Sequence, residues 1–358
     1  MEFALSEDQN MFQASVTGYL ATAAPLDEVR KVADGAPDIA ANISGGLMEL
    51  GAGQILVPDA YEGLGLGLLD AALVQEAIGA AVAPVRHLAN AMAIVGIEAA
   101  GSEAQKADWL SKIASGEVRM GVAITEYVGA REGAGVTAKS GKLSGKSLFA
   151  LEIAGATHVL VCDTDGRLHI AAADARGLQQ NRLTTIDRTR DFSELVFKNV
   201  EADALAEDNG GADRMVLAGR LLLAADSLGA AQAMLDKAVE YAKQRKQFNR
   251  VIGSFQSVKH MCAEMAAQIE PARALVWHAA HAFDEGMDEG ETMICLAKAH
   301  LAEVGTFTAR TSTEVHGGMG FTDLVGLHYW FKRIGTNRQL LGSPEQVRED
   351  AARRQGWA

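Results

Sequence analysis

Residues 213–256 read DRMVLAGRLLLAADSLGAAQAMLDKAVEYAKQRKQFNRVIGSFQ, and this stretch sets the predicted architecture. Apolar side chains recur through it at helical spacing, and neither a proline nor a long polar gap interrupts them before Arg245. A helix of about 30 residues spans roughly 45 Å, so we expect the central helix of a bundle. It ends in a basic turn around Arg245, which suits the negative end of a helix dipole. We expect a turn near Gly253 and a second helix starting at Phe255 and Gln256.

Composition narrows the class of protein. The chain has 358 residues, which suits two or three domains, and 48% of them are hydrophobic. A net charge of −13 argues against a nucleic-acid or anionic-membrane partner. The three cysteines, Cys162, Cys262 and Cys295, lack metal-ligand spacing, so we expect no metal site and a reducing compartment. The N-terminus lacks a signal-peptide pattern and no apolar run reaches about 18 residues, so we expect a cytoplasmic protein without membrane spans.

Three stretches of different character follow one another. Residues 1–118 are predicted to be helical, residues 119–205 to form a β domain, and residues 206–358 to be helical again. The β-like runs, bounded by Gly, Asp and Asn, cover 122–125, 143–145, 158–162, 168–171 and 195–197. We therefore predict an α+β, mainly α protein with an N-terminal helical domain, a middle antiparallel β-barrel domain and a C-terminal four-helix bundle. Ser6 and Gln9 form a predicted capping box at the first helix.

Two glycine-rich strings can each be interpreted either as a turn or as a phosphate-binding loop. In 61–67, YEGLGLG, a turn with positive φ is favoured over a phosphate loop, because no strand precedes it and no Lys-Ser/Thr follows. The second string, 314–321, reads EVHGGMGF and by itself predicts a helix C-cap followed by a turn. Glycines there also let backbone N–H groups approach a phosphate.

Together, the motifs resemble the acyl-CoA dehydrogenase family. In that family the long helix ends in Y-x-x-x-R-x-x-F-G and the next helix begins with F-Q. Here the matching residues are Tyr241, Arg245 and Phe248, then Phe255-Gln256, with Asn249 in place of the Gly. The order helical, β, helical is also that of the family, and the resemblance covers nearly the whole chain. It implies an FAD-dependent oxidoreductase that desaturates an acyl-CoA thioester and passes electrons to an electron-transferring flavoprotein or a similar acceptor. It also implies a homo- or hetero-oligomer.

The resemblance assigns cofactor-binding roles to particular residues. Residues 314–320 match the family's Q-x-x-G-G-x-G loop, which touches the flavin diphosphate of a neighbouring subunit, although Glu314 replaces the usual Gln. Thr125 matches a Thr at the flavin ring, and Phe149 matches the aromatic residue that packs on the flavin. Leu151 replaces the Thr that bonds flavin N5. The implied FAD-binding residues are Thr125, Phe149, Arg245, Phe248, Gln256, Glu314, Gly317, Gly318 and Gly320.

The catalytic base departs from the family's usual pattern. The base is normally the Glu of a C-terminal Y-E-G-T, and Leu341 holds that place here, where it can provide only its backbone N–H. A minority of the family carries the base on the long helix, one position before an Arg; Asp213 and Arg214 match that description. An Asp at a helix start is also favoured by the helix dipole alone.

Three functions therefore stay open. The first is a flavin-dependent acyl-CoA dehydrogenase, of a branch that resembles subunits of two-subunit bacterial enzymes acting on bulky acyl-CoAs such as steroid side chains. The second is a non-catalytic partner that completes the flavin site of a catalytic subunit. The third is a CoA-ester-binding protein without redox chemistry. Asp213, Arg245 and Gln256 favour an enzyme, whereas Leu151, Glu314 and Leu341 favour the non-catalytic partner.

Overall fold

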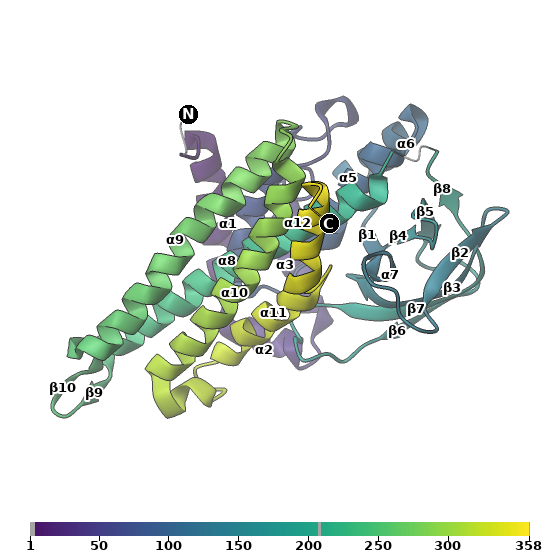
Figure 1. The fold of residues 1–358 in the computed structure, drawn as a ribbon. Coiled ribbons are helices and arrows are strands. Elements are labelled where there is room, and N and C mark those ends of the chain that lie inside the picture. Colours follow the sequence, from purple (N-terminus) through teal and green to yellow (C-terminus); the bar gives the residue numbers. More distant parts are fainter. Residues whose placement is uncertain (1–3, 207–208, 358) are drawn as a thin grey trace. The chain divides into compact units, whose positions relative to one another are not determined.

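The computed structural model describes residues 4–206 and 209–357. Helices dominate its N-terminal part (Figure 1). The helices are α1 (Glu7–Ala23), α2 (Leu26–Ala33), α3 (Pro37–Glu49), α4 (Leu68–Ala81), α5 (Leu88–Ala100) and α6 (Glu103–Ala114), with a single 3-10 turn, η1 (Asp59–Tyr61). The backbone N–H of Gln9 donates to Ser6 Oγ and the N–H of Ser6 donates to Gln9 Oε1, each at 3.1 Å. The capping box predicted for the first helix is therefore confirmed.

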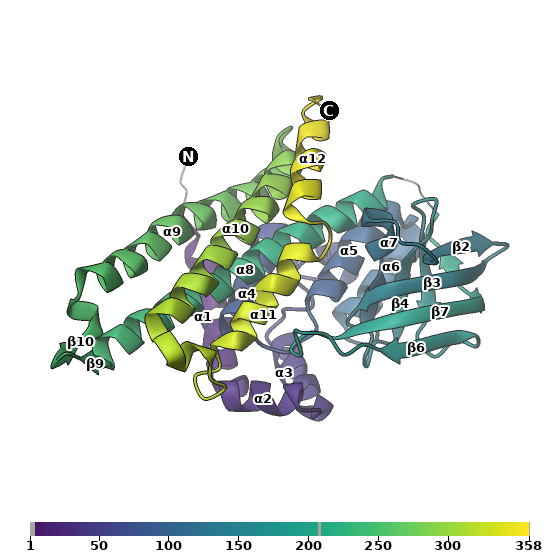
Figure 2. The ribbon, with the colours of Figure 1, turned by 60° about the horizontal axis from the view of Figure 1, so that its bottom comes forward.

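An eight-stranded sheet follows. Its strands are β1 (Met120–Ala123), β2 (Gly135–Lys139), β3 (Lys142–Leu151), β4 (His158–Cys162), β5 (Leu168–Ala172), β6 (Leu178–Arg182), β7 (Phe192–Glu201) and β8 (Asp203–Ala204). The strand order is β6-β7-β3-β1-β4-β5-β8, with β2 paired to β3. Figure 2 shows β3, β7 and β6 side by side. The pairing of β1 with β4 is parallel and the rest are antiparallel, so the antiparallel prediction holds except at this pair.

The first predicted β run extends too far. Strand β1 ends at Ala123, and Thr125 begins a short helix, α7 (Thr125–Val128). Thr125 is a β-branched residue, which accounts for its assignment to a strand from the sequence. The short helix that it begins is held on β3 by the Glu126 carboxylate, which accepts from the Ser147 hydroxyl and the Leu148 N–H, and the local pattern does not contain these contacts.

The C-terminal helices include the predicted long helix. They are α8 (Gly211–Gln244), α9 (Gln256–Asp284), α10 (Gly290–His316), α11 (Leu327–Gln339) and α12 (Pro344–Arg354), with the 3-10 turns η2 (Ile252–Ser254) and η3 (Gly317–Phe321). Helix α8 has 34 residues, which confirms the long central helix. It crosses α4 closely at two glycines. A Cβ on Gly79 would lie 2.0 Å from the backbone oxygen of Asp226, and a Cβ on Gly229 would lie 1.9 Å from the backbone oxygen of Glu76.

A small hairpin after α8 precedes the turn predicted near Gly253. Strands β9 (Lys246–Gln247) and β10 (Arg250–Val251) pair antiparallel. The two residues at the tip, Phe248 and Asn249, have φ values of 51° and 62°. Two successive positive φ values between paired residues define a type I′ hairpin turn, and Asn tolerates this conformation. Gly253 lies in the 3-10 turn η2, so the predicted turn is confirmed, whereas the hairpin before it was not predicted because Phe is an unusual residue at a left-handed turn position.

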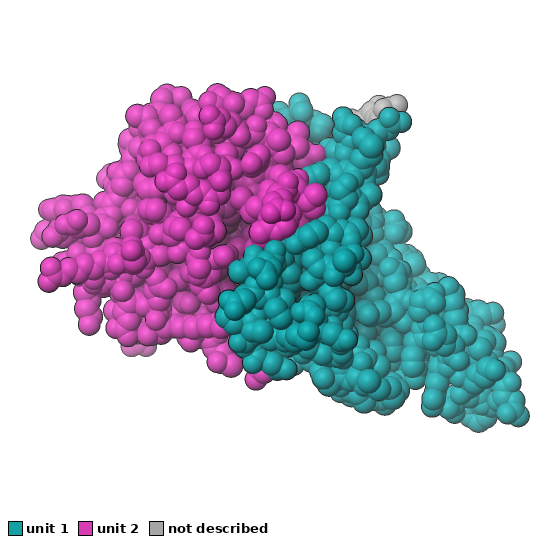
Figure 3. Space-filling model, turned by 180° about the vertical axis from the view of Figure 1, so that it is seen from behind, with its two compact units in different colours: residues 1–43, 72–84, 221–358 teal, residues 44–71, 85–220 magenta. Residues whose placement is uncertain are grey.

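The contacts divide the chain into two units (Figure 3). One unit comprises residues 1–43, 72–84 and 221–358, and the other comprises residues 44–71 and 85–220. We call them the bundle unit and the sheet unit. Helices α3, α4 and α8 contribute residues to both, and the three-domain division at 118 and 205 stays a prediction. Over residues 4–206 and 209–357, no helix combines the length and the apolarity needed to cross a membrane.

Candidate functional site

A ring stack in the bundle unit joins two motifs that are far apart in the sequence. The rings of Tyr241 and His316 lie 4.5 Å apart between centroids, with 26° between their planes. Tyr241 lies in the last turn of α8, four residues before Arg245, which directly follows the helix, and His316 is the last residue of α10, directly before Gly317. The end of α8 that carries the basic turn is therefore packed against the end of α10 that carries the glycine string.

His316 is a neutral, structural member of this stack. Its Nδ1 lies 2.8 Å from the Ser312 carbonyl oxygen, and the Ser312 hydroxyl donates to the Met234 carbonyl at 2.7 Å. Burial lowers the pKa of His316, the bond to Ser312 opposes this, and the Lys237 ammonium lowers the pKa further. The ring is therefore uncharged near neutral pH and donates from Nδ1.

The glycines of the second string differ in what they require. Gly317 has φ 58° and caps α10, as predicted. A Cβ at Gly320 would lie 2.7 Å from the Thr313 oxygen, so packing excludes a side chain there. A Cβ at Gly318 meets no atom within 4 Å, and its φ is not in the left-handed region. Neither conformation nor packing accounts for glycine at 318, whereas the close approach of a ligand would.

The hairpin tip exposes a large aromatic side chain. Phe248 is 86% exposed and meets Phe255 edge to face at 6.1 Å. The Arg250 guanidinium lies 3.9 Å from the centroid of the Phe255 ring. Arg245 is exposed, and its backbone is fixed because its N–H donates to the Tyr241 oxygen at 2.8 Å.

Two further residues of the predicted FAD site lie at the surface of the bundle unit. Gln256, the first residue of α9, places its amide nitrogen 3.3 Å from Nε2 of His260. Glu314 is exposed in the last turn of α10.

In the sheet unit, Thr125 is held against strand β3 through its neighbour Glu126. The buried Thr125 hydroxyl donates to Glu126 at 3.2 Å. The Glu126 carboxylate also accepts from the Ser147 hydroxyl and the Leu148 N–H, each at 2.8 Å. Sequence reasoning did not assign this role to Glu126, and the carboxylate directly after Thr125 was the one signal available.

Phe149 lies at the surface of the same strand. It is 37% exposed, and the Arg131 guanidinium lies 5.2 Å from its ring centroid. Leu151, two residues further on, is buried. The positions of Phe149 and Leu151 suit an aromatic surface bordered by an apolar side chain that cannot donate a hydrogen bond.

Glu152 follows Leu151, and the sequence analysis did not identify it as a site residue. Its φ is 55°, and its carboxylate accepts from the Ala89 N–H at the start of α5 at 3.0 Å. Burial raises the pKa of Glu152 to about 7, although the Ala89 bond and the guanidinium groups of Arg190 and Arg86 oppose the shift. This carboxyl therefore titrates near neutral pH inside the sheet unit.

The predicted catalytic residues lie in different units. Asp213 is half-buried in the first turn of α8, a position that the helix dipole favours for an acid. Arg214 beside it is exposed. Burial raises the pKa of Glu98, and the charge of Arg214 lowers it. Leu341 belongs to the bundle unit, where it is 2% exposed with φ 59° between α11 and α12.

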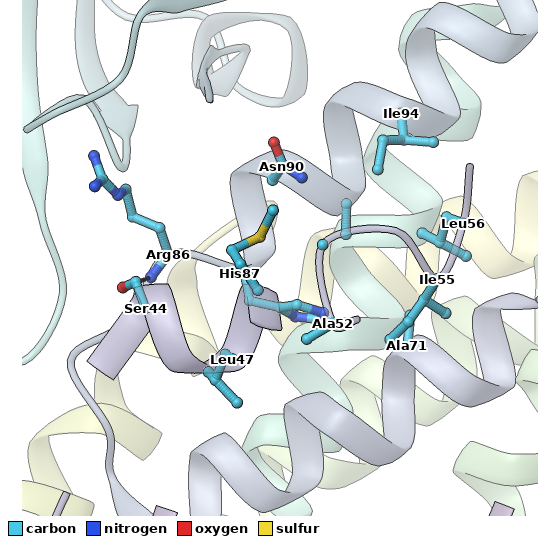
Figure 4. A pocket seen from close by; sticks show the side chains of 13 residues that line it. Ser44, Leu47, Ala52, Ile55, Leu56, Ala71, Arg86, His87, Asn90 and Ile94 are labelled. Carbon is cyan, nitrogen blue, oxygen red and sulfur yellow. Dashed lines mark hydrogen bonds between the residues drawn. The ribbon is translucent and has the colours of Figure 1, made fainter. Parts of the chain in front are cut away.

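A small pocket in the sheet unit is not the substrate site. Ser44, His87, Asn90 and Ile94 are among the residues that line it (Figure 4). Its volume of about 20 Å³ is enough for one water molecule. It is therefore too small for a flavin or an acyl thioester. Within the described residues, no cluster of three or more His, Cys, Asp and Glu side chains could hold a metal ion.

Two family models match the chain. Residues 6–117 match the N-terminal domain of acyl-CoA dehydrogenases, and residues 212–356 match the C-terminal domain. The acyl-CoA dehydrogenase IpdE2 of Mycobacterium tuberculosis is 30% identical over 302 residues, which cover 84% of this chain and 81% of the relative. IpdE2 of Mycolicibacterium smegmatis is 28% identical over 346 residues, which cover 96% and 98%.

Solved structures agree with the family models. A variant of the steroid ACAD Tcur3481-Tcur3483 is 27% identical, with a TM-score of 0.88 and 98% of each chain covered. The ChsE4-ChsE5 complex of M. tuberculosis matches in fold, with a TM-score of 0.91, 23% identity and 100% of each chain covered. The chain therefore belongs to the acyl-CoA dehydrogenase family.

Proposed function

We propose that this chain is an FAD-dependent acyl-CoA dehydrogenase and works as one subunit of an oligomer. Its substrate is an acyl-CoA thioester, and its electrons pass to an electron-transferring flavoprotein or a similar acceptor. FAD, when bound, accepts the hydride that leaves the β-carbon. The protein has to bind and orient both molecules, stabilise the charge that develops on the thioester oxygen, and take the α-proton.

The Tyr241–His316 stack carries this proposal. It holds the helix end next to Arg245 against the helix end next to Gly317 and Gly318, so a cation and a glycine backbone come from adjoining helix ends of the bundle unit. An exposed guanidinium and accessible N–H groups suit a diphosphate. Gly318 supports this assignment, because neither packing nor conformation requires glycine at that position. These residues fit the phosphate end of FAD.

The sheet unit offers a surface for the ring end of FAD. The Thr125 hydroxyl is oriented by Glu126, and Phe149 presents part of its ring at the surface. Leu151 supplies an apolar contact in place of a hydrogen bond. We assign orientation of the flavin ring to Thr125 and Phe149, and this assignment is separate from that of the diphosphate residues.

The α-proton requires a carboxylate other than residue 341, because leucine has none. We assign the base to Asp213, which is half-buried in the first turn of α8, where the helix dipole favours an acid. The backbone N–H of Leu341 is assigned to the thioester oxygen, where a preorganised donor lowers the barrier to enolate formation. Asp213→Asn keeps the size of the side chain and removes the base.

Exposure at the tip of the bundle unit supports assembly with a second acyl-CoA dehydrogenase chain. Phe248 is largely exposed, and Glu314 puts a negative charge beside the proposed diphosphate site. A second chain that covers Phe248 and shares the FAD would compensate for both. Two of the similar structures are named for pairs of proteins, Tcur3481-Tcur3483 and ChsE4-ChsE5. Leu341 favours a second candidate, a non-catalytic subunit that completes the flavin site of its partner.

Flavin content and turnover distinguish these functions. The chain is purified alone and co-expressed with a second acyl-CoA dehydrogenase chain from the same genome, and flavin per chain is measured by absorbance. We expect little flavin on the lone chain, stoichiometric flavin in the complex, and anaerobic bleaching by acyl-CoA that Asp213→Asn abolishes. Bleaching that survives Asp213→Asn places the base elsewhere or in the partner. A complex without flavin leaves the CoA-ester-binding function.

A further inference from the structure

The C-terminal end of α11 is held by a buried lysine from another helix. Lys298 of α10 is 2% exposed, and its ammonium donates to the carbonyl oxygens of Asn337 at 2.6 Å and Arg338 at 3.3 Å. The last carbonyls of a helix have no partners within the helix and form the negative end of its dipole. A buried cation at this point satisfies them and opposes that negative charge.

The same helix end is held from α8. The Asn337 side-chain amide donates to Asp226 Oδ1 at 2.6 Å and to the Ser227 hydroxyl at 3.1 Å. Asp226 is fully buried and also accepts from Arg333 Nη1 at 3.1 Å. Two helices therefore fix the last turn of α11 from different sides, Lys298 through the backbone and Asp226 through the Asn337 side chain.

The segment that these contacts hold leads directly into Leu341. The Leu340 N–H donates to the Thr336 oxygen at 3.0 Å, and Leu341 then takes φ 59° while it stays buried. A leucine in the left-handed region is unfavourable and persists only where its surroundings hold it. The direction of the Leu341 N–H is therefore set by the end of α11 and by what anchors that end.

We propose that Lys298 is a positioning residue that orients the Leu341 N–H toward the thioester oxygen of the substrate. The inference rests on the proposed function, because it needs Leu341 to serve as an oxyanion donor. Lys298 acts through the carbonyls of Asn337 and Arg338 and does not itself touch the substrate. Its positive charge also reduces the repulsion that the negative end of α11 would exert on a nearby enolate.

A ligand that ionises when bound tests this role. A 3-thiaacyl-CoA has an α-proton made acidic by its sulfur, and its enolate puts negative charge on the thioester oxygen. In the assembled holoenzyme, the pKa of the bound analogue is measured from the pH dependence of its absorbance. We expect Lys298→Met to raise that pKa by about 2 units, the equivalent of a 10²-fold loss of enolate stabilisation through a donor displaced by about 1 Å. Lys298→Arg restores a cation and is expected to recover most of the loss.

Two further variants keep the test decisive. Lys298→Gln retains a donor without charge and replaces Lys298→Met if that variant does not accumulate as folded protein. Ile269→Ala, at a fully buried position of α9, is the matched control; it is expected to lower stability and to leave the analogue's pKa unchanged. An unchanged pKa in both Lys298→Met and Lys298→Gln overturns the inference. If the parent complex fails to ionise the analogue and is not reduced by acyl-CoA, it is the proposed function that is wrong.

Discussion

The two glycine strings, 61–67 and 314–321, look alike in sequence and differ in their surroundings. In the first, a Cβ on Gly63 would lie 1.9 Å from the Val57 carbonyl oxygen, and Gly65 takes φ 58° against Asp59. In the second, Gly318 has open space around it and an ordinary φ. Glycine density by itself therefore does not identify a ligand site. Within such a string, the glycine that neither sterics nor conformation requires is the candidate for ligand contact.

The largest effect is expected at Gly63. Gly63→Ala forces a side-chain atom into the backbone of Val57, and a backbone cannot move aside as a flexible side chain can. We expect a loss of more than about 3 kcal/mol in the free energy of unfolding, measured by urea denaturation. Flavin content per folded molecule should not change. A near-neutral result would mean that the 61–67 turn is not held by packing.

Glu152 also lies at a turn with positive φ, although it is not a glycine. Here the pKa of the side chain reports on the surroundings. Its pKa is about 7 in the folded sheet unit against 4.5 for an ordinary Glu, so the native state binds the proton more tightly than the unfolded chain. The stability that this proton contributes is fully present below pH 4.5 and is lost as pH rises through 7. The loss amounts to about 3 kcal/mol between pH 4.5 and 9.

Urea denaturation across this pH range measures the effect, and Glu152→Gln should remove that component of the pH dependence. Gln keeps an acceptor for the Ala89 N–H and cannot ionise, so its stability should be flatter and higher above pH 7. An identical pH profile for the parent and Glu152→Gln would contradict burial of this carboxyl.

Gly318→Ala separates folding from ligand binding. The added methyl group meets no protein atom, so the free energy of unfolding should change by less than about 1 kcal/mol. A methyl group between the backbone and a phosphate should weaken FAD binding by roughly tenfold, about 1.4 kcal/mol, in a flavin titration of the complex. Gly335→Ala, which also has open space around it but lies in α11, is the control and should leave affinity unchanged. Equal affinities for all three proteins would remove Gly318 from the site.

The smallest effect is expected at Glu314. Glu314→Gln removes a negative charge near the proposed diphosphate, and because the side chain is exposed the gain is screened to about 1 kcal/mol, or roughly fivefold in FAD affinity. Glu285→Gln, at an exposed position after α9, serves as the control. A gain that persists unchanged at 1 M salt would show that the effect is not electrostatic.

The sequence alone was sufficient for features that depend on neighbouring residues. The helical spacing of apolar residues predicted α8, and Ser6 with Gln9 predicted the start of α1, because helix periodicity and capping are local. Short β-like runs bounded by turn residues located parts of β1, β3, β4, β5 and β7, whereas β2, β6 and β8 were not predicted. The motifs around Arg245 and Gly317 could be found as well, although nothing in the local pattern places one beside the other.

Tertiary structure decided what depends on partners distant in the chain. The parallel pairing of β1 with β4, the Tyr241–His316 stack and the type I′ turn at Phe248 each join or strain residues in ways that a local pattern does not contain. The same is true of Glu152 and Lys298, which the sequence presents as ordinary surface charges. A helix end, at Ala89 or at Asn337, offers each of them backbone groups that offset part of the cost of its desolvation.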